Sequence, residues 1–186
     1  MKTEQDYLNL LSEIKNEFSD FKVIDKTESK LMKTIDTLLR VITFGAMKEF
    51  LTRFTTTLGN TVYVPGTWPS YSVESKLIIL RHERVHMRQA RRYTRPLFSF
   101  LYLFFPLPVL FAYCRRSFEA EAYEESLAAM AEYFGPKMLL NNEKVKASML
   151  AHFTSAEYFW MWVEKGSLNN WYDTTVAKLQ NSEGDK

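Results

Sequence analysis

Several features that define other protein classes are missing from this sequence. A single cysteine, Cys114, excludes an internal disulfide and fits a reducing compartment. The first residues turn polar and acidic within a few positions, so they do not resemble a secretory signal, and we expect a cytoplasmic protein. Basic and acidic side chains nearly balance, 24 against 22, which argues against nucleic acid as the obvious partner. The chain has no internal repeat and no Pro- or Gly-rich linker.

The composition present is that of a globular domain. Apolar residues make up 46% of the chain and charged residues 25%, which excludes a disordered protein. A length of 186 residues predicts one domain over residues 1–180, with a flexible tail at 181–186. Within the domain we expect N-terminal helices over 1–52, a core over 53–135 and an aromatic-rich helical part over 136–180.

Helical periodicity dominates the chain. Apolar residues recur at helical spacing between Tyr7 and Phe18, and Thr3 can cap this helix. The short β-branched runs 54–58 and 61–64 are joined by Gly59-Asn60, which predicts a hairpin. The expected fold class is therefore α+β, mostly helical with one small sheet. Further helices are expected over residues 28–50, 72–92, 117–134, 143–153 and 156–165.

The most informative segment is a His-Glu-x-x-His pattern formed by His82, Glu83 and His86. Residues four apart on a helix share a face, so both histidines can present ring nitrogens to one Zn²⁺ at about 2.0–2.1 Å. Glu83 then lies beside the open coordination position and can take a proton from a metal-bound water as general base. The chain has only three histidines, and two of them belong to this pattern.

The surroundings of the pattern favour a metal site over the alternative, a surface helix with two incidental histidines. At about 100° per residue, six arginines form a stripe, and His82 and His86 lie almost opposite it, close to apolar residues. The histidines are therefore expected to face a partly apolar interior and the arginines to face solvent. The stripe consists of Arg81, Arg84, Arg88, Arg91, Arg92 and Arg95.

A zinc site with two histidines needs a third protein ligand. Glu119 lies on an otherwise apolar helix face, with Tyr123, Ser126, Met130 and Phe134. Glu121 lies on a face typical of a solvated side, with Glu125, Ala128 and Glu132. Burying a bare carboxylate is costly, so an inward glutamate needs a partner, and zinc is a natural one. Glu119 is the preferred third ligand and Glu121 is the second choice.

A His-Glu-x-x-His followed by a glutamate on a later helix resembles the gluzincin class of zinc metallopeptidases. The resemblance covers roughly residues 54–134 and implies a minigluzincin-like zincin core with a small hairpin beside the zinc helix. It also implies that His82, His86 and Glu119 are the zinc ligands and that Glu83 is the general base. In many gluzincins a strand at the position of 61–64 is an edge strand that pairs with an extended substrate.

The match to the family pattern is incomplete after the third ligand. Many gluzincins carry Glu-x-x-Ala-Asp there, and in this chain Tyr123 replaces the Asp. That Asp usually steadies a histidine, so the orienting partner here is not identified. Oxyanion stabilisation needs a His, Tyr or Arg donor. Tyr123, one helical turn from Glu119, is preferred as donor or orienting group over Tyr113, Tyr158 and His152, and His152 is expected to be packed or at the surface.

Residues 96–113 form an uncharged apolar stretch broken by Pro106 and Pro108. The stretch reaches the lower length limit for a membrane span, but two prolines would break a single helix. We favour the interpretation that this stretch packs within a protein that has no membrane span. The alternative is a hairpin that contacts a membrane. An aromatic cluster between Tyr158 and Tyr172 is expected to belong to the core. It is also compatible with a specificity pocket or a subunit contact.

The leading functional hypothesis is a zinc-dependent hydrolase, a small peptidase that acts on a peptide or protein substrate. The alternative is a catalytically silent, zinc-stabilised module with protein partners in a larger assembly, for example a viral or phage particle. A third hypothesis, nucleic-acid binding through the arginine stripe, is disfavoured by the near-neutral charge.

Overall fold

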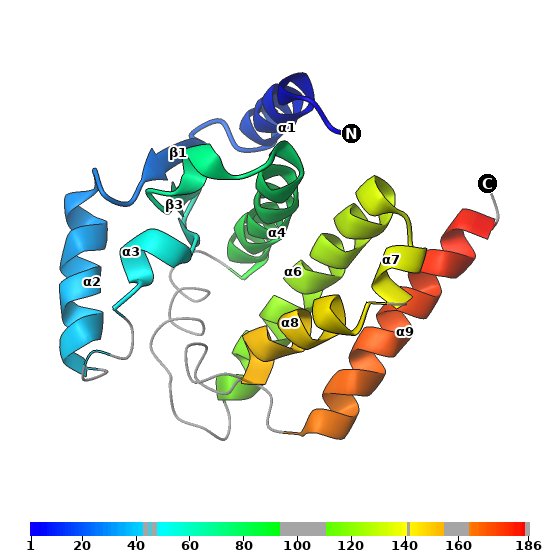
Figure 1. Cartoon of the computed structure of the whole chain (residues 1–186). Coiled ribbons are helices and arrows are strands. Elements are labelled where there is room, and N and C mark those ends of the chain that lie inside the picture. The colour runs from blue at the N-terminus through cyan, green and yellow to red at the C-terminus, as the bar shows by residue number, and fades with distance from the viewer. Residues whose placement is uncertain (43–44, 46–47, 94–110, 141, 155–163, 185–186) are drawn as a thin grey trace. The chain divides into compact units, whose positions relative to one another are not determined.

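The computed structural model describes residues 1–42, 45, 48–93, 111–140, 142–154 and 164–184 (Figure 1). Helices make up most of these residues, and three strands form one small sheet, so the α+β fold class is confirmed. Met1–Arg88 and Gln89–Lys186 form two units, and each is described by itself. The division falls inside α4 (Val73–Arg92), which is a single helix over its whole length.

The first unit begins with α1 (Glu4–Glu17), which is capped as the sequence predicts. The backbone N–H of Asp6 donates to Thr3 Oγ1, and the Asp6 carboxylate accepts in return from the backbone N–H of Thr3. This reciprocal capping satisfies two donors that a helix start otherwise leaves free. Leu10 and Ile14 lie on the buried face of the helix.

The sheet has the order β1-β3-β2, with β1 (Lys22–Asp25) parallel and β2 (Thr56–Leu58) antiparallel to the central β3 (Thr61–Val64). The predicted hairpin between β2 and β3 is confirmed, and Gly59 adopts a φ of +62° in its turn. The sequence did not predict β1. Because β1 covers one side of β3, the expectation that residues 61–64 are an edge strand is wrong, and β2 is an edge instead.

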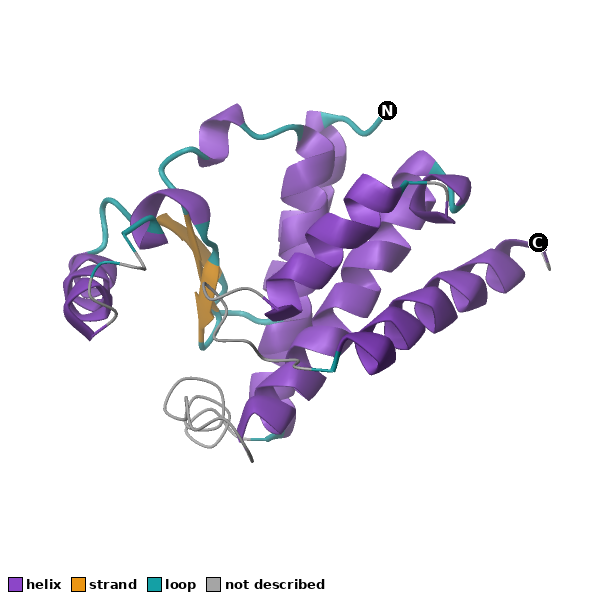
Figure 2. Ribbon diagram, turned by 60° about the horizontal axis from the view of Figure 1, so that its bottom comes forward, coloured by secondary structure: helices purple, strands orange, loops and turns teal. Residues whose placement is uncertain are grey.

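The expected continuous helix over residues 28–50 is wrong. The structure has α2 (Lys30–Ile42), then Gly45 with a φ of +84°, and then the short α3 (Phe50–Arg53). A left-handed residue cannot continue an α-helix, so the helical pattern is interrupted there. A 3-10 turn, η1 (Trp68–Ser70), leads into α4. The sheet lies between α2 on one side and α4 on the other (Figures 1 and 2).

The second unit is helical. Its long helix α6 (Phe111–Phe134) ends before Gly135, which has a φ of +82° and precedes Pro136. The end of the helix expected over 117–134 is confirmed, but the helix begins earlier than expected, at Phe111. It is followed by α7 (Lys137–Leu140), α8 (Glu143–Thr154) and α9 (Lys165–Gly184). The helix expected over 143–153 is confirmed. The core of this unit consists of Leu127, Ala131, Leu139, Met149, Tyr172 and Val176.

Some predicted segments lie outside the described residues. Most of the apolar stretch 96–113, most of the helix expected over 156–165 and Tyr158 belong to these. The structure also differs at the C-terminal end, because α9 continues through residues 181–184, which the sequence indicated to be a flexible tail. Among the helices that the structure describes, none is long and apolar enough to cross a membrane.

Candidate metal centre

His82 and His86 lie on one face of α4, as the four-residue spacing predicts. Their Nε2 atoms are 3.1 Å apart, and the two rings are nearly perpendicular, at 80°. Two nitrogen ligands of a tetrahedral Zn²⁺ lie about 3.3 Å apart, given bonds of about 2.0–2.1 Å. His86 is only 5% exposed and His82 is half-buried. The pair is therefore arranged for a shared cation, with His82 on the more accessible side.

Glu83 is buried beside the sheet. Its side chain is 6% exposed, and its Oε2 accepts a hydrogen bond of 2.6 Å from Thr57 Oγ1 on β2. This contact places the hairpin against α4. A hydrogen bond this short is typical of a hydroxyl donating to a carboxylate. The sequence identified Glu83 but not Thr57. The pattern of a short strand predicts the strand itself, but it does not show which residue of another element a strand side chain contacts.

Lys26, directly after β1, is a buried lysine that the sequence analysis missed. Its Nζ donates to the Phe50 carbonyl at 3.1 Å and to Thr56 Oγ1 at 2.8 Å, and it lies 3.7 Å from the centroid of the Phe50 ring. Burial lowers the pKa of Lys26 to about 7, although the carboxylates of Glu83 and Asp36 act in the opposite direction. No periodic signal distinguishes this lysine from a surface residue.

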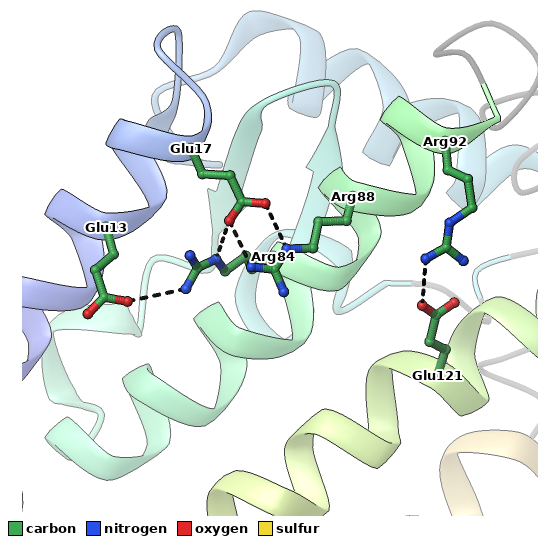
Figure 3. Close-up of polar contacts among 6 residues, drawn as sticks. All are labelled: Glu13, Glu17, Arg84, Arg88, Arg92 and Glu121. Atoms are coloured by element: carbon green, nitrogen blue, oxygen red, sulfur yellow. Dashed lines mark hydrogen bonds and ion pairs between the residues drawn. The ribbon is translucent and has the colours of Figure 1, made fainter.

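The arginine stripe of α4 is partly a docking face for α1, not only a solvated face (Figure 3). Arg84 Nε and Arg88 Nε each lie 2.7 Å from a carboxylate oxygen of Glu17, and Arg84 also reaches Glu13 at 3.3 Å. The hydrogen bond from Arg88, and then that from Arg84, holds the pKa of Glu17 at about 2. The Arg84 side chain is 20% exposed, so the expectation that it faces solvent is wrong.

The two candidate third ligands lie on α6 in different environments. Glu119 is 4% exposed, in agreement with the predicted inward face. Glu121 is half-buried and accepts a hydrogen bond from Gln89 Nε2 at 2.9 Å. It accepts a second from Arg92 at 3.5 Å, which Figure 3 shows. These contacts tie the last turn of α4 to α6. Of the two glutamates, Glu119 is therefore the more buried, and Glu121 is the one bound to the last turn of α4.

Tyr123 follows Glu119 by one turn of α6 and packs against α8. Its ring lies 5.2 Å from the His152 ring and 5.1 Å from the Phe153 ring, measured between centroids. His152 is half-buried, and its Nδ1 lies 2.8 Å from the Ser148 carbonyl, which matches the expectation of a packed histidine. Tyr123 is therefore held at a fixed place on α6 by aromatic neighbours.

The structure thus brings His82, Glu83 and His86 together in the first unit, with Thr57 and Lys26 as neighbours that the sequence did not reveal. Glu119 and Tyr123 lie one turn apart in the second unit. In comparisons with protein-family models, with curated proteins and with solved structures, nothing matches this chain.

Proposed function

We propose that this chain is a zinc-dependent metallohydrolase of the gluzincin type, a small cytoplasmic peptidase that cleaves amide bonds in peptides or proteins. The observation that carries the proposal is the pair of histidine Nε2 atoms 3.1 Å apart on α4, the helix that also carries the buried Glu83 immediately after His82. Neighbouring imidazoles on one helix face and an adjacent carboxylate are the parts that metal-assisted hydrolysis requires.

The third proposed ligand is Glu119. In this proposal Glu119, which is 4% exposed on α6, completes the ligand set with His82 and His86. Gln89, on the turn of α4 after His86, donates to the Phe118 carbonyl at 3.0 Å and to Glu121 at 2.9 Å, so it binds the residues on both sides of Glu119.

Two imidazole nitrogens and one carboxylate oxygen fit Zn²⁺ and leave a fourth position open, as catalytic zinc sites do. Zinc, when bound, would polarise the scissile carbonyl and make water a stronger nucleophile. In this proposal Glu83 accepts the proton of the attacking water and passes it to the leaving nitrogen. Tyr123 is proposed as the hydrogen-bond donor to the developing oxyanion.

The first test is zinc content per chain by elemental analysis, for the wild type, Glu119→Ala and Glu121→Ala. We expect one zinc per chain in the wild type and in Glu121→Ala, and loss of zinc in Glu119→Ala. Zinc retained by Glu119→Ala and lost by Glu121→Ala would contradict the proposed ligand set. Wild type without zinc after incubation with ZnCl₂ would contradict the metal site.

The second test measures hydrolysis of fluorescein-labelled casein by the wild type and by Glu83→Gln. Glutamine keeps the shape of the side chain but cannot accept the proton, so we expect Glu83→Gln to retain zinc and to lose turnover. Turnover in Glu83→Gln equal to that of the wild type would contradict the proposed base. Zinc bound by a wild type that hydrolyses no casein would favour the zinc-stabilised assembly module.

A further inference from the structure

The hydrogen bond between Thr57 and Glu83 connects the proposed base to the sheet. In the described part of the chain, Thr57 is the one side chain that donates a hydrogen bond to Glu83, and it does so at Oε2 alone. The second carboxylate oxygen, Oε1, is therefore left for a water molecule. A charge-assisted bond of 2.6 Å also restricts rotation of the carboxylate about its terminal torsion.

Thr57 is itself held in place from two directions. It is paired with Val62 in the antiparallel ladder of β2 and β3, and Val62 is completely buried. The preceding residue, Thr56, accepts a hydrogen bond of 2.8 Å from the buried Nζ of Lys26. Adjacent side chains on a strand point to opposite faces. Lys26 therefore anchors β2 from one face while the Thr57 hydroxyl reaches Glu83 on the other.

We propose that Thr57 is a positioning residue that fixes the Glu83 carboxylate with Oε1 free to receive the proton of the attacking water. The inference rests on the proposed hydrolytic function. Displacing a catalytic group by about 1 Å can cost on the order of 100-fold in rate, so a base without its orienting donor should be much less effective. Thr57 does not ligate the metal, and its removal should leave zinc binding intact.

The test compares Thr57→Val, which keeps the shape and loses the hydroxyl, with Thr57→Ser, which keeps the hydroxyl. Thr61→Val, on the neighbouring strand, controls for removing a sheet hydroxyl. With labelled casein we expect kcat of Thr57→Val to fall about 10- to 100-fold with KM within about twofold, and Thr57→Ser to keep most of the turnover. All variants should bind one zinc per chain, and Thr61→Val should match the wild type.

A second readout does not depend on turnover. A double-mutant cycle of Thr57→Val and Glu83→Met, measured by urea unfolding in excess ZnCl₂, isolates the interaction of the two side chains. We expect a coupling of about tenfold or more in the unfolding equilibrium constant, as for a hydrogen bond to a charged group.

The outcomes separate this inference from the function on which it rests. Coupling together with loss of kcat in Thr57→Val and rescue in Thr57→Ser supports the positioning role. Absence of coupling, or full turnover in Thr57→Val, overturns that role alone. A zinc-loaded wild type that hydrolyses no casein overturns the proposed function and the positioning role together.

Discussion

The Nε2 atoms of His82 and His86 lie 3.1 Å apart on consecutive turns of α4. At this distance one ring nitrogen can donate a hydrogen bond to the other, or both nitrogens can ligate one metal ion. The helix fixes both rings before any ligand arrives, because their spacing follows from the backbone. A prearranged pair of this kind should bind a divalent metal in the folded chain and not in the unfolded chain.

Zinc should therefore raise the melting temperature of the wild type. A ligand at 1,000 times its Kd stabilises the folded state by about 4 kcal/mol, and each kcal/mol shifts Tm by about 2–4 °C in a chain of this size. We expect a shift of about 8–16 °C by differential scanning calorimetry, reversed by EDTA. His86→Ala should abolish the shift and His152→Ala should retain it. Equal shifts in both variants would contradict metal binding at the α4 pair.

Local patterns carried most of what the sequence predicted correctly. The helical spacing in α4 and the Gly59-Asn60 turn depend on residues close together in the chain, so both elements were predicted with their approximate bounds. The strand β1 has only four residues and gains its hydrogen bonds from β3, with Lys22 paired to Thr61. A short strand stabilised by such a distant partner leaves no periodic signal of its own.

The same distinction applies to the candidate site. His82, Glu83 and His86 form one local motif, so the sequence identified them together. Thr57 reaches Glu83 from 26 positions earlier in the chain, and nothing in the local pattern marks that contact. Periodicity also assigned Arg84 to one helix face correctly but could not show that α1 covers this face through Glu17.

Glu17 should stabilise the first unit in a pH-dependent manner. Its pKa is lowered from 4.5 to about 2 by Arg88 and Arg84, so its contribution is complete above about pH 4.5 and is lost as the pH falls toward 2. After allowance for solvent screening, Glu17→Gln should lower the free energy of unfolding by about 1–2 kcal/mol at pH 7.

The measurement is urea unfolding of the wild type, Glu17→Gln and Glu13→Gln at pH 7 and pH 3. Glu13 is the matched control, because its side chain is 63% exposed and its contact with Arg84 is longer, at 3.3 Å. We expect the Glu13 variant to lose less than about 0.5 kcal/mol. An equal loss in Glu17→Gln at both pH values would show that packing, and not charge, is responsible.

Lys26 should give a pH dependence of the same sign as Glu17, but in the alkaline range. Burial lowers its pKa from 10.5 to about 7, so the unfolded chain binds more protons than the folded chain between these values, and stability rises as the pH increases through that window. Lys26→Met cannot titrate and should lack this increase. The difference in unfolding free energy between wild type and variant should therefore grow in favour of the wild type by up to about 1.4 kcal/mol per pH unit.

Urea unfolding at pH 6.5, 8 and 9.5 measures this difference directly. Lys22→Met is the control, since Lys22 is exposed on β1 and its replacement should preserve the wild-type pH dependence. A constant difference between wild type and Lys26→Met across the three pH values would contradict a buried, titrating Lys26.

Two glycines with equally open surroundings should respond in opposite directions to substitution by alanine. Neither Gly135 nor Gly166 has an atom within 4 Å of an added Cβ, so steric contact cannot explain any difference between them. Gly135 has a φ of +82° at the end of α6, where alanine costs about 1–2 kcal/mol. Gly166 lies in the first turn of α9, where alanine gains up to about 1 kcal/mol of helix propensity. Thermal unfolding should therefore show a lower Tm for Gly135→Ala and an equal or higher Tm for Gly166→Ala. A lower Tm in both variants would mean that α9 does not begin as an α-helix at Lys165, because only a non-helical backbone at residue 166 would make alanine unfavourable there.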